Sequence, residues 1–228
     1  MESGTERAVF AFILEAGVKV GCEDETAATA AVLTQRFFRK VPDTLAAVCP
    51  YTLATAALYL AGKLHNDFVK IRDAINVAYS ALQPGEGPLE VGELYWDLRD
   101  GVGALELLLC RTLAFHFHIT HPHVFLSQYL DALRSWCSRE DWDSSRVTET
   151  ALTLLRDSYI QPDLPTSGSP QLFALACIKI ALDVYGVEVP YAGRKDSLPW
   201  WQVFYPAALE EDLNQLSTKI FTALLPNS

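Results

Sequence analysis

Four histidines lie close together and are the first candidates for chemistry in this chain: His116, His118, His121 and His123. Neutral imidazoles are good zinc ligands, so the cluster suggests a metal site. No cysteine or carboxylate nearby completes a ligand pattern, and the stretch falls between two sets of predicted helices. Alternating histidine and aromatic residues can simply pack in such a linker, so we favour packing and expect neither a metal nor a cofactor.

The sequence shows no catalytic motif. A Gly-rich phosphate loop, a G-x-S-x-G nucleophile elbow and an H-E-x-x-H helix are all missing from it, so we expect a protein that is not an enzyme. The pair Trp200-Trp201 suggests a docking anchor, because tryptophan is enriched at interface hot spots. Burial beneath the second half of the chain is the favoured interpretation of this pair.

Two charged residues stand in apolar surroundings. Lys63 is the single charge in the apolar stretch from Tyr51 to Leu64, near its end. By local sequence alone, it is a lysine stabilised by the helix dipole. Glu106 lies between leucines, where an unpaired carboxylate would be costly. We therefore expect Glu106 to have a partner, either within the protein or on a second protein.

Apolar residues at helical spacing, separated by clusters of Gly and Pro, predict an all-α fold that positions these side chains. Small and large apolar residues surround almost the whole circumference of residues 51–64, which predicts a central helix of a bundle. A boundary between two halves is expected at residues 115–123. The predicted helices are residues 5–20, 27–40, 51–64, 69–82, 93–114, 122–137, 145–159, 169–185 and 207–225, with a short aromatic turn at 200–204.

The pattern P-x-x-[LF]-A-x-A-x-[LI]-x-[LI]-A occurs twice, beginning at Pro50 and at Pro170. An internal repeat is the economical interpretation, with each copy a small bundle built around one nearly all-apolar helix. Chance similarity between two alanine-rich helices is the alternative, because short apolar helices resemble each other easily.

Composition and charge restrict the functional class further. The formal net charge of −10 disfavours direct nucleic-acid binding, which needs clustered Lys and Arg. Five scattered cysteines without a C-x-x-C pair indicate reduced thiols and an intracellular protein. No apolar run reaches membrane-spanning length, so we expect a soluble protein of the nucleus, the cytoplasm or both, without a membrane partner.

Several strings resemble the cyclin family, and in particular its transcription-type branch. They are Glu15-Ala16-Gly17, Ala28-Thr29-Ala30, Arg36-Phe37-Phe38, the box signature Leu60-Ala61-Gly62-Lys63, and Glu106 at the position of the box glutamate. The resemblance implies tandem five-helix cyclin-fold bundles, an N-terminal cyclin box at 1–117 and a C-terminal repeat at 118–228.

Other strings, spread over both halves, resemble the cyclin Q group of this family. They are Ile71-Arg72-Asp73-Ala74-Ile75-Asn76-Val77, His121-Pro122-His123, Leu154-Leu155-Arg156-Asp157-Ser158-Tyr159, Val184-Tyr185-Gly186-Val187-Glu188-Val189-Pro190 and Pro199-Trp200-Trp201-Gln202-Val203-Phe204. This resemblance implies a cyclin-dependent kinase as partner, specifically the tenth cyclin-dependent kinase.

By the same resemblance, the chain activates the kinase by holding its αC helix in the active position. Lys63 and Glu106 would supply the polar contacts of an apolar groove. The expected apolar contributors are Leu60, Leu64, Phe68 and Leu109, with Leu105 and Leu113 as further candidates. For each leucine, packing in the core is the alternative.

One departure from the family pattern opens other functions. Family members usually follow the box lysine with K-[VI]-E-E, whereas Leu64, His65 and Asn66 follow Lys63 here. A divergent copy that binds a kinase without activating it, a scaffold, fits this loss of an acidic pair. A cyclin-fold transcription factor that binds DNA is a further alternative, which the acidic composition disfavours.

Overall fold

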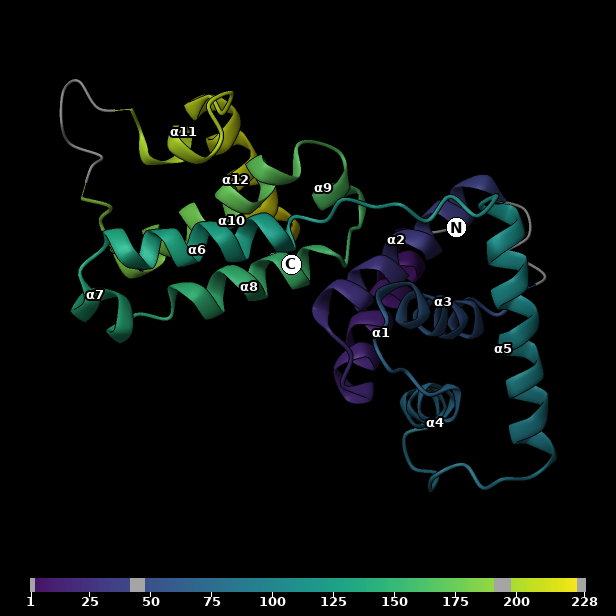
Figure 1. The fold of residues 1–228 in the computed structure, drawn as a ribbon. Helices are drawn as coiled ribbons and strands as arrows, with labels where there is room; N and C mark the ends of the chain where they lie inside the picture. Colours follow the sequence, from purple (N-terminus) through teal and green to yellow (C-terminus); the bar gives the residue numbers. More distant parts are fainter. Residues whose placement is uncertain (1–2, 42–47, 191–197, 225–228) are drawn as a thin grey trace. The chain divides into compact units, whose positions relative to one another are not determined.

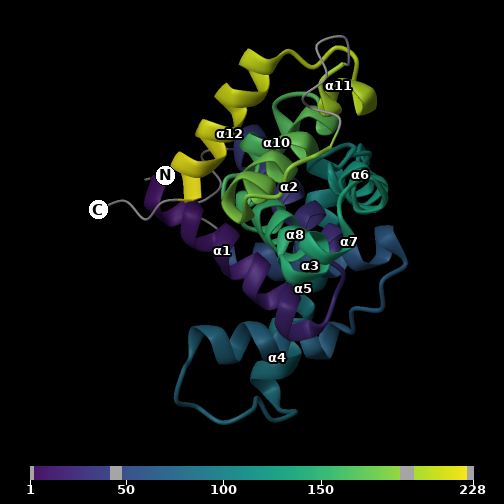
Figure 2. The same ribbon diagram turned by 90° about the vertical axis from the view of Figure 1, so that its left-hand side faces the viewer.

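The computed structural model describes residues 3–41, 48–190 and 198–224 (Figures 1 and 2). Their regular structure is entirely helical, which confirms the predicted all-α class. No helix among the described residues is both long and apolar enough to cross a membrane. The chain forms two compact units: unit 1 contains Met1–Ile119 and Tyr159–Pro162, and unit 2 contains Thr120–Ser158 and Asp163–Ser228.

Unit 1 is built around one central helix, α3 (Figure 1). Helix α3 packs against each of the other four helices of the unit. Ala54, Ala57 and Ala61 are fully buried along α3, where small side chains allow neighbouring helices to approach closely. The helices of unit 1 are α1 (Ser3–Val20), α2 (Asp24–Lys40), α3 (Pro50–His65), α4 (Ile71–Leu82) and α5 (Glu93–Thr112).

Close approach explains two glycines of the family-like strings. A Cβ atom on Gly62 would lie 2.8 Å from Cγ2 of Val69, and one on Gly17 would lie 2.9 Å from Cβ of Ala27. Both distances are too short for real contacts, so a larger residue at either position would push packed side chains apart. Gly62 therefore fixes the path of the chain directly beside Lys63.

Unit 2 is likewise built around one helix, α10, which packs against α6, α8 and α12. Ser169 caps the N-terminus of α10, because its Oγ accepts a hydrogen bond from the Leu172 backbone N–H at 3.4 Å. The helices of unit 2 are α6 (His123–Trp136), α7 (Arg139–Ser144), α8 (Val147–Ser158), α9 (Asp163–Thr166), α10 (Pro170–Tyr185), α11 (Trp200–Phe204) and α12 (Glu210–Leu224).

The central helices of the two units support the predicted repeat. Both begin at a proline and end at a residue in the left-handed region, Asn66 in α3 and Gly186 in α10. The degree of burial is also the same at every corresponding position, residues 51–70 against residues 171–190. Chance similarity of two alanine-rich helices does not explain equal burial that extends beyond the C-terminal ends of both helices.

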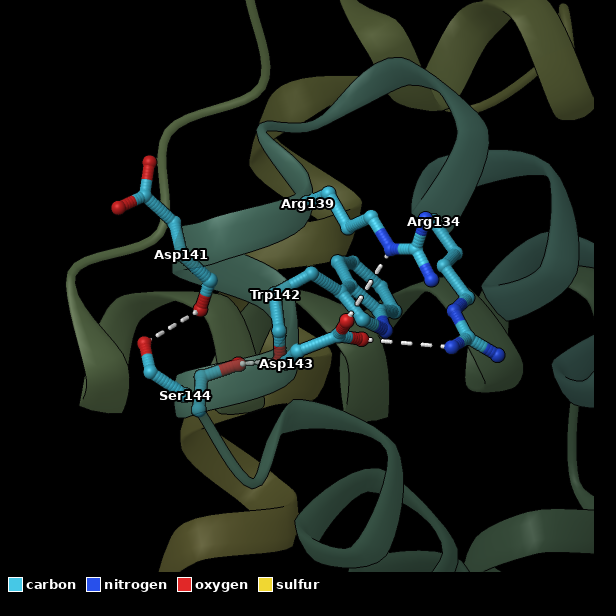
Figure 3. A network of polar contacts seen from close by, with 7 residues as sticks. Arg134, Arg139, Asp141, Trp142, Asp143 and Ser144 are labelled. Carbon is cyan, nitrogen blue, oxygen red and sulfur yellow. Dashed lines mark hydrogen bonds and ion pairs between the residues drawn. The ribbon is translucent and has the colours of Figure 1, made fainter.

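Unit 2 contains two short helices, α7 and α9, in addition to the five predicted for it. Figure 3 shows how side chains hold α7 against α6. The Asp143 carboxylate accepts from Arg134 at 3.3 Å and from Arg139 at 3.5 Å. Trp142 of α7 is buried, with only 6% of its surface exposed, and Ser138 caps the N-terminus of the helix. The helix is therefore stabilised by specific contacts that a periodic pattern cannot reveal.

Aromatic rings cover one side of α6. The Phe204 ring of α11 lies 4.5 Å from the Tyr129 ring and 5.0 Å from the Trp136 ring, centroid to centroid. Trp200 is 6% exposed and contacts both Trp201 and Phe204. For Trp200, the favoured interpretation of burial rather than docking is confirmed.

Candidate functional site

Lys63 and Glu106 meet at the surface of unit 1, where the last turn of α3 lies against the middle of α5. Lys63 Nζ donates to Oε1 of Glu106 at 2.6 Å and to Oε2 at 2.9 Å. The sequence required a partner for the Glu106 carboxylate, and the structure supplies one within the chain. The two residues expected to contact a second protein therefore form one preorganised polar unit.

The two members of this pair are unequally covered. The Lys63 side chain is 49% exposed, whereas that of Glu106 is only 18% exposed. Lys63 Nζ also lies 4.0 Å from the centroid of the Tyr59 ring, in the position of a cation–π contact. Burial by itself lowers the pKa of Lys63, but the hydrogen bond and charge of Glu106, together with Tyr59, outweigh it and raise that pKa. The ammonium thus remains charged and partly open to solvent.

The residues after Lys63 that depart from the family pattern have local structural roles. Asn66 adopts φ 56°, a left-handed conformation that asparagine tolerates better than glutamate. His65 Nε2 lies 2.7 Å from Thr29 Oγ1, which ties the end of α3 to α2. His65 and Asn66, which stand in place of the acidic pair, therefore carry no negative charge and instead stabilise the C-terminal end of α3.

A third local contact fixes the same turn. Oδ2 of Asp67 accepts from the Glu23 backbone N–H at 2.8 Å and from Thr26 Oγ1 at 2.9 Å. These bonds satisfy donors at the N-terminus of α2, where Glu23 makes no side-chain cap. Together, His65 and Asp67 join the C-terminal end of α3, which carries Lys63, to helix α2.

The apolar candidates divide into exposed and buried residues. Leu64 is 39% exposed and Phe68 is 84% exposed, so both are open to a partner. Leu60 is 5% exposed and Leu109 is fully covered, so their side chains belong to the core of unit 1. In the chain by itself these two leucines therefore follow the alternative of core packing, and a contact of either with a partner stays a prediction.

Helix α5 contributes an exposed face that the sequence reasoning did not single out. Gly103, Glu106, Leu107 and Cys110 recur at helical spacing and so share one side of α5. Leu107 is 48% exposed, and a Cβ on Gly103 would meet nothing within 4 Å. Burial raises the pKa of the Cys110 thiol, and the Glu106 carboxylate raises it further. The run Leu107-Leu108-Leu109 indicates this exposed face from sequence, because three successive residues point in different directions around a helix and a helix with one side in solvent cannot bury all three.

The remaining candidates lie elsewhere. His121 is 3% exposed, with its ring 5.7 Å from that of His123, centroid to centroid. Among the described residues no group of three or more metal-binding side chains converges. A separate cleft of about 500 Å³ opens between the first half of α3, α4 and the first half of α5, and Tyr51, Tyr79 and Leu98 are among its lining residues. The cleft contains neither Lys63 nor Glu106.

Residues 2–117, which include this site, match the family described as the cyclin N-terminal domain. The chain therefore belongs to the cyclin family. It is 28% identical to cyclin-L2 of Mus musculus over 212 residues, 91% of this chain and 38% of that protein. It is 25% identical to cyclin-K of Danio rerio over 211 residues, 89% of this chain and 46% of that protein. The chain thus spans less than half the length of these relatives.

Two solved structures share the fold. A chain in the crystal structure of the yeast RNA Pol II CTD kinase CTDK-1 complex matches with a TM-score of 0.66 and 17% identity, over 96% of this chain and 65% of that one. A chain of the CAK complex from Chaetomium thermophilum bound to ATP-gamma-S matches with a TM-score of 0.69 and 20% identity, over 98% of this chain and 62% of that one. At these identities the likeness establishes the cyclin-type helical fold.

Proposed function

We propose that this cyclin is a regulatory subunit that binds a cyclin-dependent kinase and holds the kinase αC helix in its active position. The observation that carries the proposal is the Lys63–Glu106 pair, which lies on an exposed, partly apolar face of α3 and α5. The relatives bear cyclin names, and the two solved structures named above are described as a CTD kinase complex and as a CAK complex bound to ATP-gamma-S. The same similarities support a regulatory role rather than catalysis by the chain itself.

The pair suits the recognition of a helix end. An ammonium has three donors, and Glu106 occupies part of this capacity, so Lys63 has room to donate to main-chain carbonyls of the kinase segment beside αC. Glu106 keeps the ammonium in place and at the same time accepts from donors of the partner. Preorganisation lowers the entropy that binding would otherwise cost.

Exposed apolar side chains surround this polar centre and supply the remaining contact area. Leu64 and Phe68 extend from the end of α3, and Leu107 lies beside Glu106 on α5. Leu60 and Leu109 support these residues from the core. An amphipathic kinase helix would lay its apolar side on this surface, as helices do in other grooves.

Activation then follows from a shift between two states of the kinase. A kinase is active when its β3 lysine pairs with the αC glutamate, which requires αC to lie inward. A cyclin that binds only the inward state shifts the population toward it, and a hundredfold shift needs a difference in binding free energy of about 2.7 kcal/mol. An interface of standard size is large enough to provide this difference.

The tenth cyclin-dependent kinase is the partner that we propose, and cyclin Q the group. The proposal rests on the strings quoted above from both units, among them Ile71 to Val77 on α4 and Trp200 to Phe204 on α11. Choice among related kinases is a difference of affinities spread over many contacts, so Lys63 and Glu106 alone do not determine it.

The test is phosphotransfer by the tenth cyclin-dependent kinase with and without this chain. We expect stimulation by the native chain and its loss in the variant Lys63→Ala with Glu106→Ala. A matched control is Lys19→Ala with Glu15→Ala, which removes an exposed ion pair of the same residue types, 2.5 Å apart, from α1. The control should retain stimulation, provided both variants show native circular dichroism.

Other outcomes point to the alternatives. Stable binding without stimulation would replace activation with a scaffold function. Salt-sensitive retention on duplex DNA without kinase binding would favour a DNA-binding cyclin-fold factor, against the net charge of −10. Undiminished stimulation by the folded Lys63→Ala, Glu106→Ala variant would show that the Lys63–Glu106 face is not the contact, and equal loss in the control would show that the loss is not specific to this face.

A further inference from the structure

The internal repeat gives unit 2 a structural counterpart of the candidate site. Helix α10 corresponds to α3 position by position, so Lys63 corresponds to Asp183 and Leu64 corresponds to Val184. Buried Leu60 corresponds to Ile180, which is 9% exposed. The place of the lysine in unit 1 is thus occupied by a carboxylate in unit 2.

Helix α12 corresponds to α5 by the same criterion. The degree of burial from Val102 to Leu109 repeats at each position from Leu213 to Ile220, with fully covered or nearly fully covered residues at both ends. This register assigns Ser217 to the position of Glu106. By the same register, Thr218 corresponds to Leu107 and Phe221 corresponds to Cys110.

These counterparts converge in space, although their register rests on the repeat and on burial rather than on proximity. In unit 2, where α12 lies alongside α10 (Figure 2), they line one groove of about 400 Å³. Its lining residues include Ile180, Asp183, Val184, Ser217, Thr218 and Phe221. The fold therefore presents the same helix-to-helix surface twice, once in each unit.

The two surfaces differ in what crosses them. In unit 1 the Lys63–Glu106 ion pair joins α3 to α5. In unit 2 the corresponding side chains turn back to their own helices: Ser217 Oγ donates to the Leu213 carbonyl at 2.8 Å, and Asp183 accepts from Lys179 at 2.7 Å. The groove is consequently left open between α10 and α12.

The chemistry of the groove is apolar with an acidic edge. Val184 is 61% exposed and Phe221 is 56% exposed, and the Asp183 side chain is 65% exposed. A second hollow, which shares Thr218 with the groove, continues along α12 to Glu210 and Glu211. Apolar walls beside carboxylates are complementary to a helix that carries apolar side chains next to Lys or Arg.

We propose that the α10–α12 groove binds an amphipathic helix of another protein, with apolar side chains placed against Val184 and Phe221 and a Lys or Arg placed on Asp183. The proposal uses the proposed function in one respect, by taking the corresponding face of unit 1 as a surface for helices. The occupant differs in polarity, because Asp183 replaces the cation of unit 1. The Lys179–Asp183 pair joins two residues of one helix, and its carboxylate is 65% exposed, so a partner's cation can reach Asp183 from solvent.

The probe is a synthetic alanine-rich helical peptide of about 18 residues, long enough to form a helix in water, with two leucines at i, i+4 spacing flanked by lysines. A second peptide carries glutamates in place of the lysines. Binding to the full isotope-labelled chain is followed by amide chemical shifts. We expect the lysine peptide to shift amides of α10 and α12, and Phe221→Ser to weaken its affinity about tenfold.

Reversal of charge makes the test specific. Asp183→Lys should reduce affinity for the lysine peptide about tenfold and make the glutamate peptide the better ligand. Phe68→Ser, which removes the exposed ring of unit 1, is the matched control and should leave affinity for the lysine peptide unchanged. The proposal is overturned if neither peptide binds, if the shifts fall in the cleft of α3, α4 and α5, or if Asp183→Lys leaves the preference unaltered.

The outcome is independent of the kinase assay. Kinase stimulation with no peptide bound in the groove would overturn this proposal alone. Peptide binding in the groove with no kinase bound to unit 1 would overturn the proposed function alone. Phosphotransfer should be equal for native chain and Phe221→Ser when kinase is the only partner present, and a loss there would assign Phe221 to the kinase contact instead.

Discussion

Replacing Lys63 with methionine should destabilise unit 1 more than replacing Glu106 with leucine, although both changes break the same ion pair. The reason is the unequal cover of the two side chains, 49% exposed for Lys63 and 18% for Glu106. Lys63→Met leaves a largely covered carboxylate without its cation. Glu106→Leu leaves a half-exposed ammonium that water can solvate.

The magnitudes follow from these exposures. A covered acceptor that loses its partner costs about 1–3 kcal/mol, and the remaining exposure of Glu106 places Lys63→Met near the lower half of this range, at about 1–2 kcal/mol. Glu106→Leu should cost about 0.5 kcal/mol, the value typical of an exposed pair. The double variant has no stranded carboxylate, so it should be more stable than Lys63→Met alone.

Native-state hydrogen exchange of the α3 and α5 amides is the suitable measurement, because it reports the free energy of unfolding of unit 1 separately from unit 2. The three variants and the native chain complete a double-mutant cycle, with a coupling energy of about 1 kcal/mol expected. A larger cost for Glu106→Leu than for Lys63→Met would refute the reasoning. So would a double variant less stable than either single variant.

Three further expectations follow from the structure. The pKa of Lys63 is raised above its ordinary 10.5. The stabilisation by the ion pair should therefore be complete below pH 10.5 and disappear as the pH rises through the higher folded-state pKa. The free energies of unfolding of the native chain and of Lys63→Met, measured against pH, should converge over that range. Gly62→Ala should lower the free energy of unfolding by about 1–3 kcal/mol because its Cβ would lie 2.8 Å from Val69 Cγ2, and urea unfolding that shows no loss would contradict this packing. Burial raises the pKa of the Cys22 thiol to about 11, whereas at Cys49 burial is outweighed by hydrogen bonds with Thr52 and the Tyr51 backbone, which lower the pKa. Iodoacetamide at pH 8 should therefore modify Cys49 well before Cys22 in peptide mapping, and the opposite order would be inconsistent with these environments.

The long helices could be predicted from sequence because each has an apolar period or a clear stop signal. Pro50 and Ser169-Pro170 mark helix starts that the structure reproduces at α3 and α10. Helices α7 and α9, of six and four residues, are too short to show a period. Their positions depend on contacts such as Arg134 with Asp143, which join neighbouring elements rather than positions on one helix.

The candidate site was predictable in its members but not in its arrangement. Lys63 and Glu106 were predicted from the resemblance to the cyclin box, and the need of Glu106 for a partner was predicted from its apolar surroundings. Their mutual bond joins positions 43 residues apart and depends on how α3 crosses α5. Leu60 and Leu109 could not be separated from Leu64 by type or spacing, since burial depends on neighbouring helices. The groove of α10 and α12 joins residues that are distant in the sequence, so it depends on the packing of these two helices.

The contact between Asp67 and the start of α2 has a consequence for the order in which the chain folds. The N-terminus of helix α2 is capped by Asp67, which lies 44 positions after Glu23. During synthesis, α2 is complete long before Asp67 exists, so its first turn should remain frayed until the turn after α3 has formed. Ordered α2 and a correctly placed Lys63 should then arise in the same folding event, so the surface proposed to bind a kinase would form as one unit.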